Sequence, residues 1–198
     1  MKQLKPMIVA LSMAVLLTGC TKLTMMTRDR STVYIQDNGK VAGIFFEEFD
    51  KSYYDKDELE EYIDNEVSDQ NAVLGKNSVK VNYFSVKNEL AKVGFVFSDL
   101  ESYNTFNACN IEAGTMDELE PKLEQEKISA FYTTDGKRIK KKNMELENTK
   151  AIMVDESIQV KVDGEILYVT KNVTMHEKHE DEAIVPGDGY SCIIYKEK

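Results

Sequence analysis

Residues 33–49 carry the sequence VYIQDNGKVAGIFFEEF, which decides the fold class of this chain. Two β-prone runs, 33–36 and 41–49, flank a central Asn38-Gly39 pair. An Asn-Gly pair accepts the positive φ angles of a tight turn, so the segment predicts two antiparallel strands joined in a hairpin. The domain is therefore expected to be built on an antiparallel sheet.

The same turn signal recurs twice further along the chain, at Asp135-Gly136 and Asp163-Gly164, where we also expect hairpins. Valine and phenylalanine are frequent in the runs 79–86 and 90–97, which predict another hairpin around residues 87–89. More β-prone runs follow at 151–154, 158–162, 166–170 and 190–195. Strands are therefore expected to dominate the second half of the chain.

Helix starts interrupt the strands at three places. Residues 55–58 resemble a capping box, and apolar residues follow them at helical spacing as far as Val67. Residues 98–101 open a shorter helix. A third helix begins at 115–118, although Pro121 falls inside it and lacks the main-chain N–H that would bond back to the preceding turn. Two or three helices are therefore expected beside the sheet.

Length and composition are those of one globular domain. The chain has 198 residues, 42% of them hydrophobic and 30% charged, and no linker rich in Pro, Gly or Ser divides residues 33–198. We therefore predict a single α+β domain, an antiparallel sheet built from hairpins with two or three helices against one face. The 25 basic and 35 acidic residues leave a net charge of -10, which argues against nucleic-acid binding because that function needs a broad basic face.

The start of the chain forms a distinct segment. Lys2 and Lys5 make a basic head, residues 7–17 are apolar apart from Ser12, and Cys20 follows shortly after. The apolar run is too short to cross the roughly 30 Å hydrocarbon core of a bilayer as a helix. The layout is therefore typical of a signal peptide, and a permanent anchor or an ordinary buried helix explains it less well.

Leu17-Thr18-Gly19-Cys20 resembles the lipobox of bacterial lipoproteins. The resemblance implies that residues 1–19 are removed as a signal peptide, that Cys20 becomes a diacylated N-terminus, and that residues 20–32 form a short tether. Two acyl chains hold a protein stably on a membrane, so the resemblance also implies a lipid anchor on the extracytoplasmic face of the cell membrane. In general plan the chain is similar to small uncharacterised lipoproteins of Gram-positive bacteria. That likeness implies no activity and leaves the type of envelope open.

Two further cysteines, Cys109 and Cys192, are candidates for a disulfide. Outside the cytoplasm they can pair, and closing a loop of this length stabilises a fold by about 4.5 kcal/mol in the chain-entropy view. The alternative is two separate small apolar side chains. The spacing does not decide between these, because pairing depends on the Cα separation. Neither cysteine has a histidine close in sequence, so a catalytic thiol is not expected.

His176 and His179 are the only histidines, and they lie in the run His-Glu-Lys-His-Glu-Asp-Glu at 176–182. Three residues apart on a helical turn, the two histidines have a spacing that allows them to share a metal ion with a carboxylate. The zincin motif is not met, because the second histidine comes one residue too early, and a charged, solvated loop explains the run better. Asp55 and Asp57 begin like a calcium loop, but the glycine that such a loop needs is missing, and a capped helix start explains them. We therefore expect no metal site and no cofactor.

No hydrolase elbow, dinucleotide fingerprint or phosphate-binding loop occurs in the sequence, so nothing argues for an enzyme. The leading hypothesis is a membrane-anchored module that binds a ligand or an envelope protein. The alternative is a cell-wall or small-substrate hydrolase. A transport-type solute-binding protein fits less well, because no linker between two lobes is visible. A pocket that gathers a nucleophile and a base would favour the hydrolase, and a flat or aromatic-lined groove would favour binding.

Tyrosines at strand and helix spacings are candidates for an aromatic platform that binds glycans or peptides. Core filling and cross-strand pairing explain such positions more often, and we expect them to dominate here. The tyrosines concerned are Tyr34, Tyr53, Tyr54, Tyr62, Tyr83 and Tyr103.

A basic run at residues 137–142 stands out against the acidic chain. It follows the expected Asp135-Gly136 turn, which places it on a hairpin arm or an exposed loop. Two interpretations are open: the run balances nearby Glu145 and Glu147, or it contacts anionic lipid heads or anionic wall polymers. Its basic residues are Lys137, Arg138, Lys140, Lys141 and Lys142.

Overall fold

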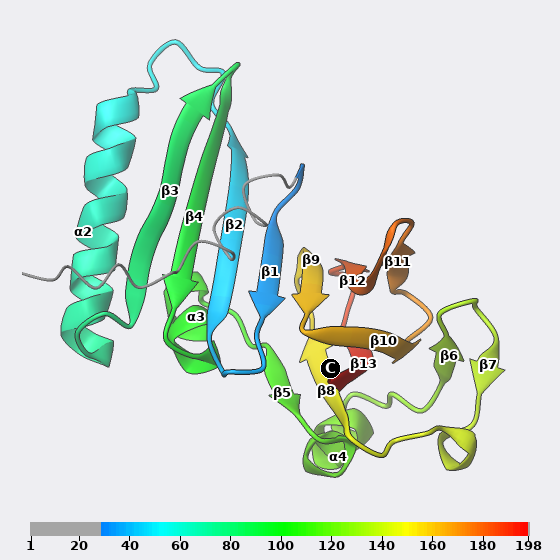
Figure 1. Ribbon diagram of the computed structural model, residues 1–198. Helices are drawn as coiled ribbons and strands as arrows, with labels where there is room; N and C mark the ends of the chain where they lie inside the picture. The colour runs from blue at the N-terminus through cyan, green and yellow to red at the C-terminus, as the bar shows by residue number, and fades with distance from the viewer. Residues whose placement is uncertain (1–28, 198) are drawn as a thin grey trace, which may run out of the picture.

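The computed structural model describes residues 29–197, which form an α+β single-domain fold (Figure 1). Within this range the chain folds into two mostly antiparallel sheets and three α-helices, so the predicted fold class is confirmed. The predicted signal peptide, Cys20 and the tether up to residue 28 lie outside the described residues. No helix of the described part is long and apolar enough to cross a membrane.

The larger sheet contains seven strands in the spatial order β11-β12-β9-β1-β2-β4-β3. Their bounds are β1 (Thr32–Ile35), β2 (Val41–Glu48), β3 (Val79–Lys87), β4 (Leu90–Phe97), β9 (Ser157–Val162), β11 (Thr174–His176) and β12 (His179–Pro186). The smaller sheet contains six strands in the order β5-β8-β13-β10-β6-β7. Their bounds are β5 (Glu112–Gly114), β6 (Phe131–Thr133), β7 (Arg138–Ile139), β8 (Thr149–Val154), β10 (Gly164–Val169) and β13 (Ser191–Glu197). The helices are α2 (Lys56–Leu74), α3 (Leu100–Asn107), α4 (Met116–Gln125) and a short 3-10 helix, η1 (Lys141–Asn143).

Two layers of apolar side chains hold these elements together. The main core lies between the two sheets and extends under α2 and α3, which lie at the β3 and β4 side of the larger sheet (Figure 1). It includes Val33 and Val160 from the larger sheet, Ile193 from the smaller sheet and Tyr103 from α3, all fully buried. A second cluster, which includes Leu119 of α4, packs that helix against the other face of the smaller sheet. The helices therefore cover two sheets, not one face of a single sheet as predicted.

Three predicted hairpins are confirmed. β1 and β2 pair across Asn38-Gly39, and β6 and β7 pair across Asp135-Gly136. β3 and β4 pair across Asn88 and Glu89, whose φ angles are 52° and 60°. Two successive positive φ angles are what a type I′ turn requires, so here the turn forms without a glycine.

The hairpin predicted at Asp163-Gly164 is wrong. β9 pairs with β1 and β12 in the larger sheet, whereas β10 pairs with β13 and β6 in the smaller one, so these two residues carry the chain from one sheet to the other. Asp163 anchors the crossing by accepting hydrogen bonds from the Tyr34 hydroxyl and, at 3.1 Å, from the main-chain N–H of Asp37. Gly164 is needed for close approach, because a Cβ there would lie 2.2 Å from the carbonyl oxygen of Lys196.

One strand pair departs from the predicted antiparallel pattern. β1 runs parallel to β9, with Val33 opposite Val160 and Ile35 opposite Val162. The two strands come from opposite ends of the domain. Because no short turn joins them, the sequence contains no turn signal that predicts this pairing. It joins the N-terminal hairpin sheet to the C-terminal strands and makes them one sheet.

All three predicted helices form, and their caps are those expected. Oδ1 of Asp55 accepts hydrogen bonds from the main-chain N–H groups of Asp57 and Glu58 at 2.8 and 3.1 Å. α4 has a complete capping box between Thr115 and Glu118. It also continues through Pro121, which is exposed; the stabilising factor is the buried stripe on the other side of the helix, formed by Met116, Leu119 and Leu123.

The charged run at 176–182 is not the solvated loop that was predicted. It forms the end of a hairpin in which β11 and β12 are joined by a turn at Glu177 and Lys178. β12 is then held in the larger sheet by its ladder to β9 and by the burial of Ala183 and Val185 in the main core. Glu182 is carried into the interior with this strand and has no exposed surface.

Candidate functional site

An apolar groove of about 520 Å³ lies between the end of β2, the loop 49–55 and the first turn of α2. Figure 1 shows this loop leaving the end of β2 beside the β3–β4 turn and descending into α2. The main-chain N–H of Phe49 donates to the carbonyl oxygen of Glu89 at 2.7 Å, which ties the loop to that turn. The apolar lining is Phe45, Phe49, Tyr53, Tyr54, Leu59, Ala91 and Val93.

Three aromatic rings that line the groove form a connected cluster. The centroid of the Tyr54 ring lies 5.0 Å from that of Phe49 and 5.0 Å from that of Tyr53. Tyr53 is nevertheless 75% exposed and Tyr54 42% exposed. Aromatic side chains that remain exposed on a defined hollow are typical of binding surfaces, because they bury a large area when a partner arrives.

The polar lining of the groove is entirely acidic: Glu47, Glu48, Asp55 and Glu58. Lys51 in the loop and Lys56 at the start of α2 do not line it. Lys51 pairs with Asp50 at 2.7 Å, and the Lys56 ammonium lies 4.0 Å from Glu60. The lining therefore combines apolar side chains with acidic ones, a combination that selects for apolar partners carrying positive charge.

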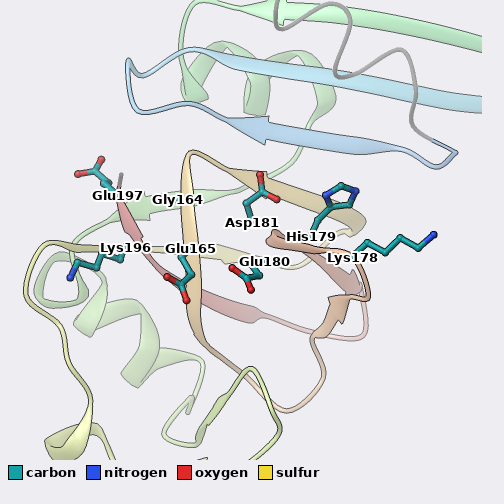
Figure 2. Close-up of a pocket in the computed structure, with 8 residues that line it drawn as sticks. All are labelled: Gly164, Glu165, Lys178, His179, Glu180, Asp181, Lys196 and Glu197. Atoms are coloured by element: carbon teal, nitrogen blue, oxygen red, sulfur yellow. The ribbon is translucent and has the colours of Figure 1, made fainter.

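A second hollow, of about 450 Å³, has a polar lining contributed by β10, β12 and β13 (Figure 2). Glu165 and Glu180 approach each other there, while Lys178 extends away from them (Figure 2). His179 also lines this hollow. Among the described residues no Ser, Thr or Cys side chain hydrogen bonds to either histidine.

Cys109 and Cys192 are free thiols in the structure, and no disulfide joins them. Cys192 is fully buried in the cluster beneath α4, whereas Cys109 packs against the main core on the other side of the smaller sheet. Burial raises the pKa of the Cys192 thiol to about 12. Burial and the neighbouring Glu156 carboxylate also raise the pKa of Cys109. Neither thiol is therefore an activated nucleophile at neutral pH.

The basic run lies on the β6–β7 arm and η1, as predicted, and all five basic side chains are exposed. Lys137 pairs with Asp135 at 2.6 Å, and Lys141 pairs with Glu120 of α4. Among the described residues neither Glu145 nor Glu147 forms an ion pair with the run. Asp135 and Glu120 therefore pair with two of the five basic residues, and the sequence neighbours Glu145 and Glu147 pair with none of them.

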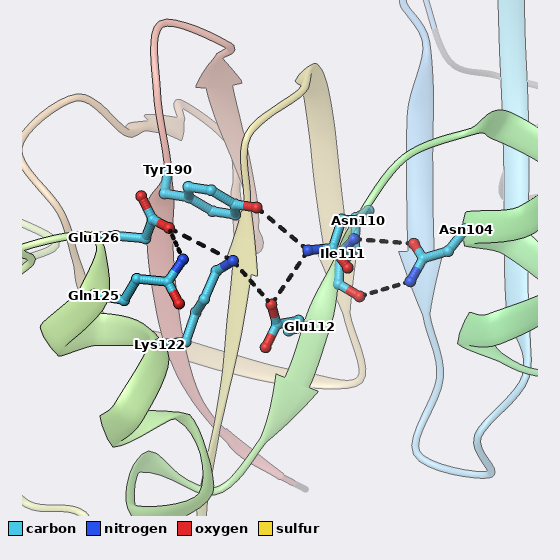
Figure 3. A network of polar contacts seen from close by, with 8 residues as sticks. All are labelled: Asn104, Asn110, Ile111, Glu112, Lys122, Gln125, Glu126 and Tyr190. Atoms are coloured by element: carbon cyan, nitrogen blue, oxygen red, sulfur yellow. Dashed lines mark hydrogen bonds and ion pairs between the residues drawn. The ribbon is translucent and has the colours of Figure 1, made fainter.

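A polar network ties α3, β5, α4 and the start of β13 together (Figure 3). The ammonium of Lys122 lies over the Tyr190 ring, 4.4 Å from its centroid, and 3.4 Å from a carboxylate oxygen of Glu112. Asn110 donates to both Glu112 and the Tyr190 hydroxyl at 3.3 Å. Each charge has a partner inside the network, which fits a structural role in holding α4 on the smaller sheet.

No protein-family model, no curated protein and no solved structure matches this chain. The geometry of the described residues is therefore the basis for a functional proposal.

From the sequence, the six candidate tyrosines are assigned mainly to core filling and cross-strand pairing. That assignment is right for Tyr103, which has no exposed surface, and wrong for Tyr53, Tyr54 and Tyr62, which are 75%, 42% and 60% exposed. A signal was present: Tyr53 and Tyr54 stand next to each other in a charged stretch with no alternation of apolar and polar residues. Such a stretch predicts a loop, where rings have no core to fill.

Proposed function

We propose that this chain is a lipoprotein anchored through Cys20 to the extracytoplasmic face of a cell membrane, and that its domain binds a protein partner through the aromatic groove. The observation that carries the binding function is the ring cluster of Phe49, Tyr53 and Tyr54, whose two tyrosines are exposed, in a hollow that acidic residues also line. The anchor is supported by the resemblance of residues 17–20 to a lipobox.

The chemistry of the groove points to a peptide segment that presents apolar side chains flanked by lysine or arginine. The rings and Val93 offer an apolar contact surface, and the groove volume of about 520 Å³ lies in the range of ligand-binding hollows. The four lining acids favour a cationic partner and disfavour an anionic one, such as a wall polymer rich in phosphate. The domain is thus a binding module for a basic, amphipathic segment of another envelope protein.

Labelled peptides test this proposal by fluorescence anisotropy. One peptide alternates lysine with phenylalanine, a second replaces lysine with glutamate, and a third replaces phenylalanine with serine. We expect the chain to bind the first peptide more tightly than the other two. The double variant Tyr53→Ala/Tyr54→Ala should bind it about tenfold or more weakly, since exposed aromatic anchors dominate binding energies of this kind.

Tyr62→Ala is the matched control, because Tyr62 is an exposed tyrosine on α2, with an exposed fraction between those of Tyr53 and Tyr54, that does not line the groove. It should leave the affinity unchanged. The double variant Glu47→Gln/Glu48→Gln should weaken binding and reduce its dependence on salt. Equal affinity for the lysine and glutamate peptides, or equal losses for the Tyr53/Tyr54 and Tyr62 variants, would refute the groove as the binding site.

A further inference from the structure

The tip of the β11–β12 hairpin brings the only two histidines of the chain together. His176 ends β11, His179 begins β12, and the two face each other across the turn. Their ring centroids are 4.7 Å apart. The main-chain N–H of Lys178 donates to Nδ1 of His176 at 3.2 Å, which holds that ring beside the turn.

An irregularity in the hairpin adds a carboxylate to this pair. Met175 lies opposite Ala183, but His176 lies opposite His179, so residues 180–182 have no partner in β11. In a regular strand His179 and Glu182 would point to opposite faces of the sheet, because side chains alternate. A bulge re-aims side chains, and here it leaves Glu182 on the same side as the histidines.

We propose that His176, His179 and Glu182 form a binding site for a divalent transition-metal ion, with zinc as the best fit. One ring nitrogen of each histidine and one carboxylate oxygen of Glu182 lie within 4.8 Å of one another. Ligand atoms of a tetrahedral zinc ion are about 3.3 Å apart, so small side-chain rotations close the site. Two imidazoles and one carboxylate suit zinc and its neighbours in the first transition row, whereas calcium and magnesium prefer oxygen ligands.

The surroundings of Glu182 orient its carboxylate. Glu182 has no exposed surface, and Nε2 of Gln159 donates to its Oε2 at 2.5 Å. The Lys161 ammonium lies 3.4 Å from its Oε1 and also pairs with Asp181. Outer-shell partners of this kind fix the position of a metal-binding carboxylate. The amide oxygen of Gln159 is buried and has no hydrogen-bond partner among the described residues. The hydrogen bond from its Nε2 to Glu182 therefore positions this amide.

The site is open on one side. His179 is exposed and lines the polar hollow of Figure 2 together with Glu180 and Asp181. Three protein ligands leave one position of a tetrahedral ion for water or for a ligand that enters from this hollow. The hollow contains none of the residues that line the aromatic groove, so the metal site does not depend on the groove's function.

Calorimetric titration of the full chain in detergent with zinc alone tests the proposal. We expect one saturable site per chain, insensitive to excess calcium or magnesium. His179→Ala should bind zinc about tenfold or more weakly, since loss of a ligand costs at least as much as loss of an outer-shell partner. Because His179 is exposed, this variant is expected to keep its fold. Glu182→Gln should weaken binding as well, and circular dichroism checks that it remains folded.

Glu180→Gln is the matched control, because Glu180 is an exposed acid on the same strand outside the ligand set. It should leave zinc affinity unchanged. Cobalt added in place of zinc should give a visible spectrum without the strong thiolate band, which separates this site from Cys109 and Cys192. A chain that shows no saturable zinc binding, or a His176→Ala/His179→Ala variant with the affinity of the wild type, would overturn the proposal.

Discussion

Cys20 is the residue on which the proposed location of this protein depends. If the lipobox works as the resemblance implies, Cys20 carries a diacylglyceryl thioether and residues 1–19 are absent from the mature chain. Cys20→Ala should then give an unlipidated precursor that is not cleaved by the lipoprotein signal peptidase. Intact-mass measurement of the wild type and the variant, expressed in a bacterium with that pathway, provides the test. A wild-type chain that begins at Met1, or that carries a free Cys20 thiol, would contradict the anchor.

At Cys192 the structure predicts a defined dependence of stability on pH. The thiol has an ordinary pKa of 9.0, and burial raises its pKa to about 12 in the folded chain. Between these values the unfolded chain has released a proton that the folded chain keeps. The free energy of unfolding therefore falls as pH rises through this window, by about 1.4 kcal/mol per pH unit for this one group, and the contribution is fully present below pH 9.

Cys192→Ala removes this contribution and serves to isolate it from other groups that titrate in the same range. Urea denaturation should show a variant that is less stable than the wild type below pH 9, because it leaves a small cavity. Its stability should then fall less steeply than that of the wild type between pH 9 and pH 12. Identical slopes would show that Cys192 is accessible or paired in solution, as in the disulfide considered from the sequence.

The crossing between β9 and β10 is the element that joins the two sheets. Gly164→Ala would place a Cβ 2.2 Å from a main-chain oxygen of β13 and 2.9 Å from the Tyr195 ring, so the backbone has to move. We expect a loss of about 1–3 kcal/mol in the free energy of unfolding. Gly114→Ala is the comparison, because there the nearest atom, at 2.8 Å, is the end of the Glu118 side chain, which can move at the cost of its cap hydrogen bond without a shift of the backbone. Equal costs at the two glycines would argue against a tight crossing.

The β6–β7 arm and η1 carry the basic run at residues 137–142. One of the two interpretations of this run is contact with anionic surfaces. Arg138, Lys140 and Lys142 are exposed and form no ion pair with any described residue, whereas Lys137 and Lys141 are paired. A chain that starts at Thr21 should therefore bind anionic vesicles more tightly than neutral ones. The triple variant Lys140→Glu/Lys141→Glu/Lys142→Glu should lose this preference, at about 1 kcal/mol per basic residue near the surface. Vesicle sedimentation at low and high salt measures it, and equal binding to both vesicle types would leave the arm as a solvated surface.

Across the whole molecule, the shared core predicts that the two sheets unfold together. Val160 is fully buried in the layer between them. Val160→Ala should lower the free energy of unfolding by about 2 kcal/mol. Hydrogen exchange followed by mass spectrometry should then show equal loss of protection in β3–β4 and in β8–β13. Val73→Ala, at a position on α2 that is 79% exposed, should have almost no effect. Loss of protection confined to one sheet would show two separate folding units.

Local structure was determined by the sequence itself. The turns at Asn38-Gly39 and Asp135-Gly136 and the caps at Asp55 and Thr115 were predictable, because turn angles and cap hydrogen bonds involve residues a few positions apart. α4 forms although Pro121 lies inside it, because the packing of its buried stripe against the smaller sheet stabilises the helix.

Only the tertiary structure decided how the hairpins join and what their surfaces offer. The β1–β9 pairing, the crossing at Gly164 and the approach of Glu182 to the two histidines all link segments whose relation depends on strand register. The exposure of Tyr53 was decided in the same way, by whether another element packs over it. The packing of the whole chain determines such contacts, so they cannot be predicted from a pattern of neighbouring residues.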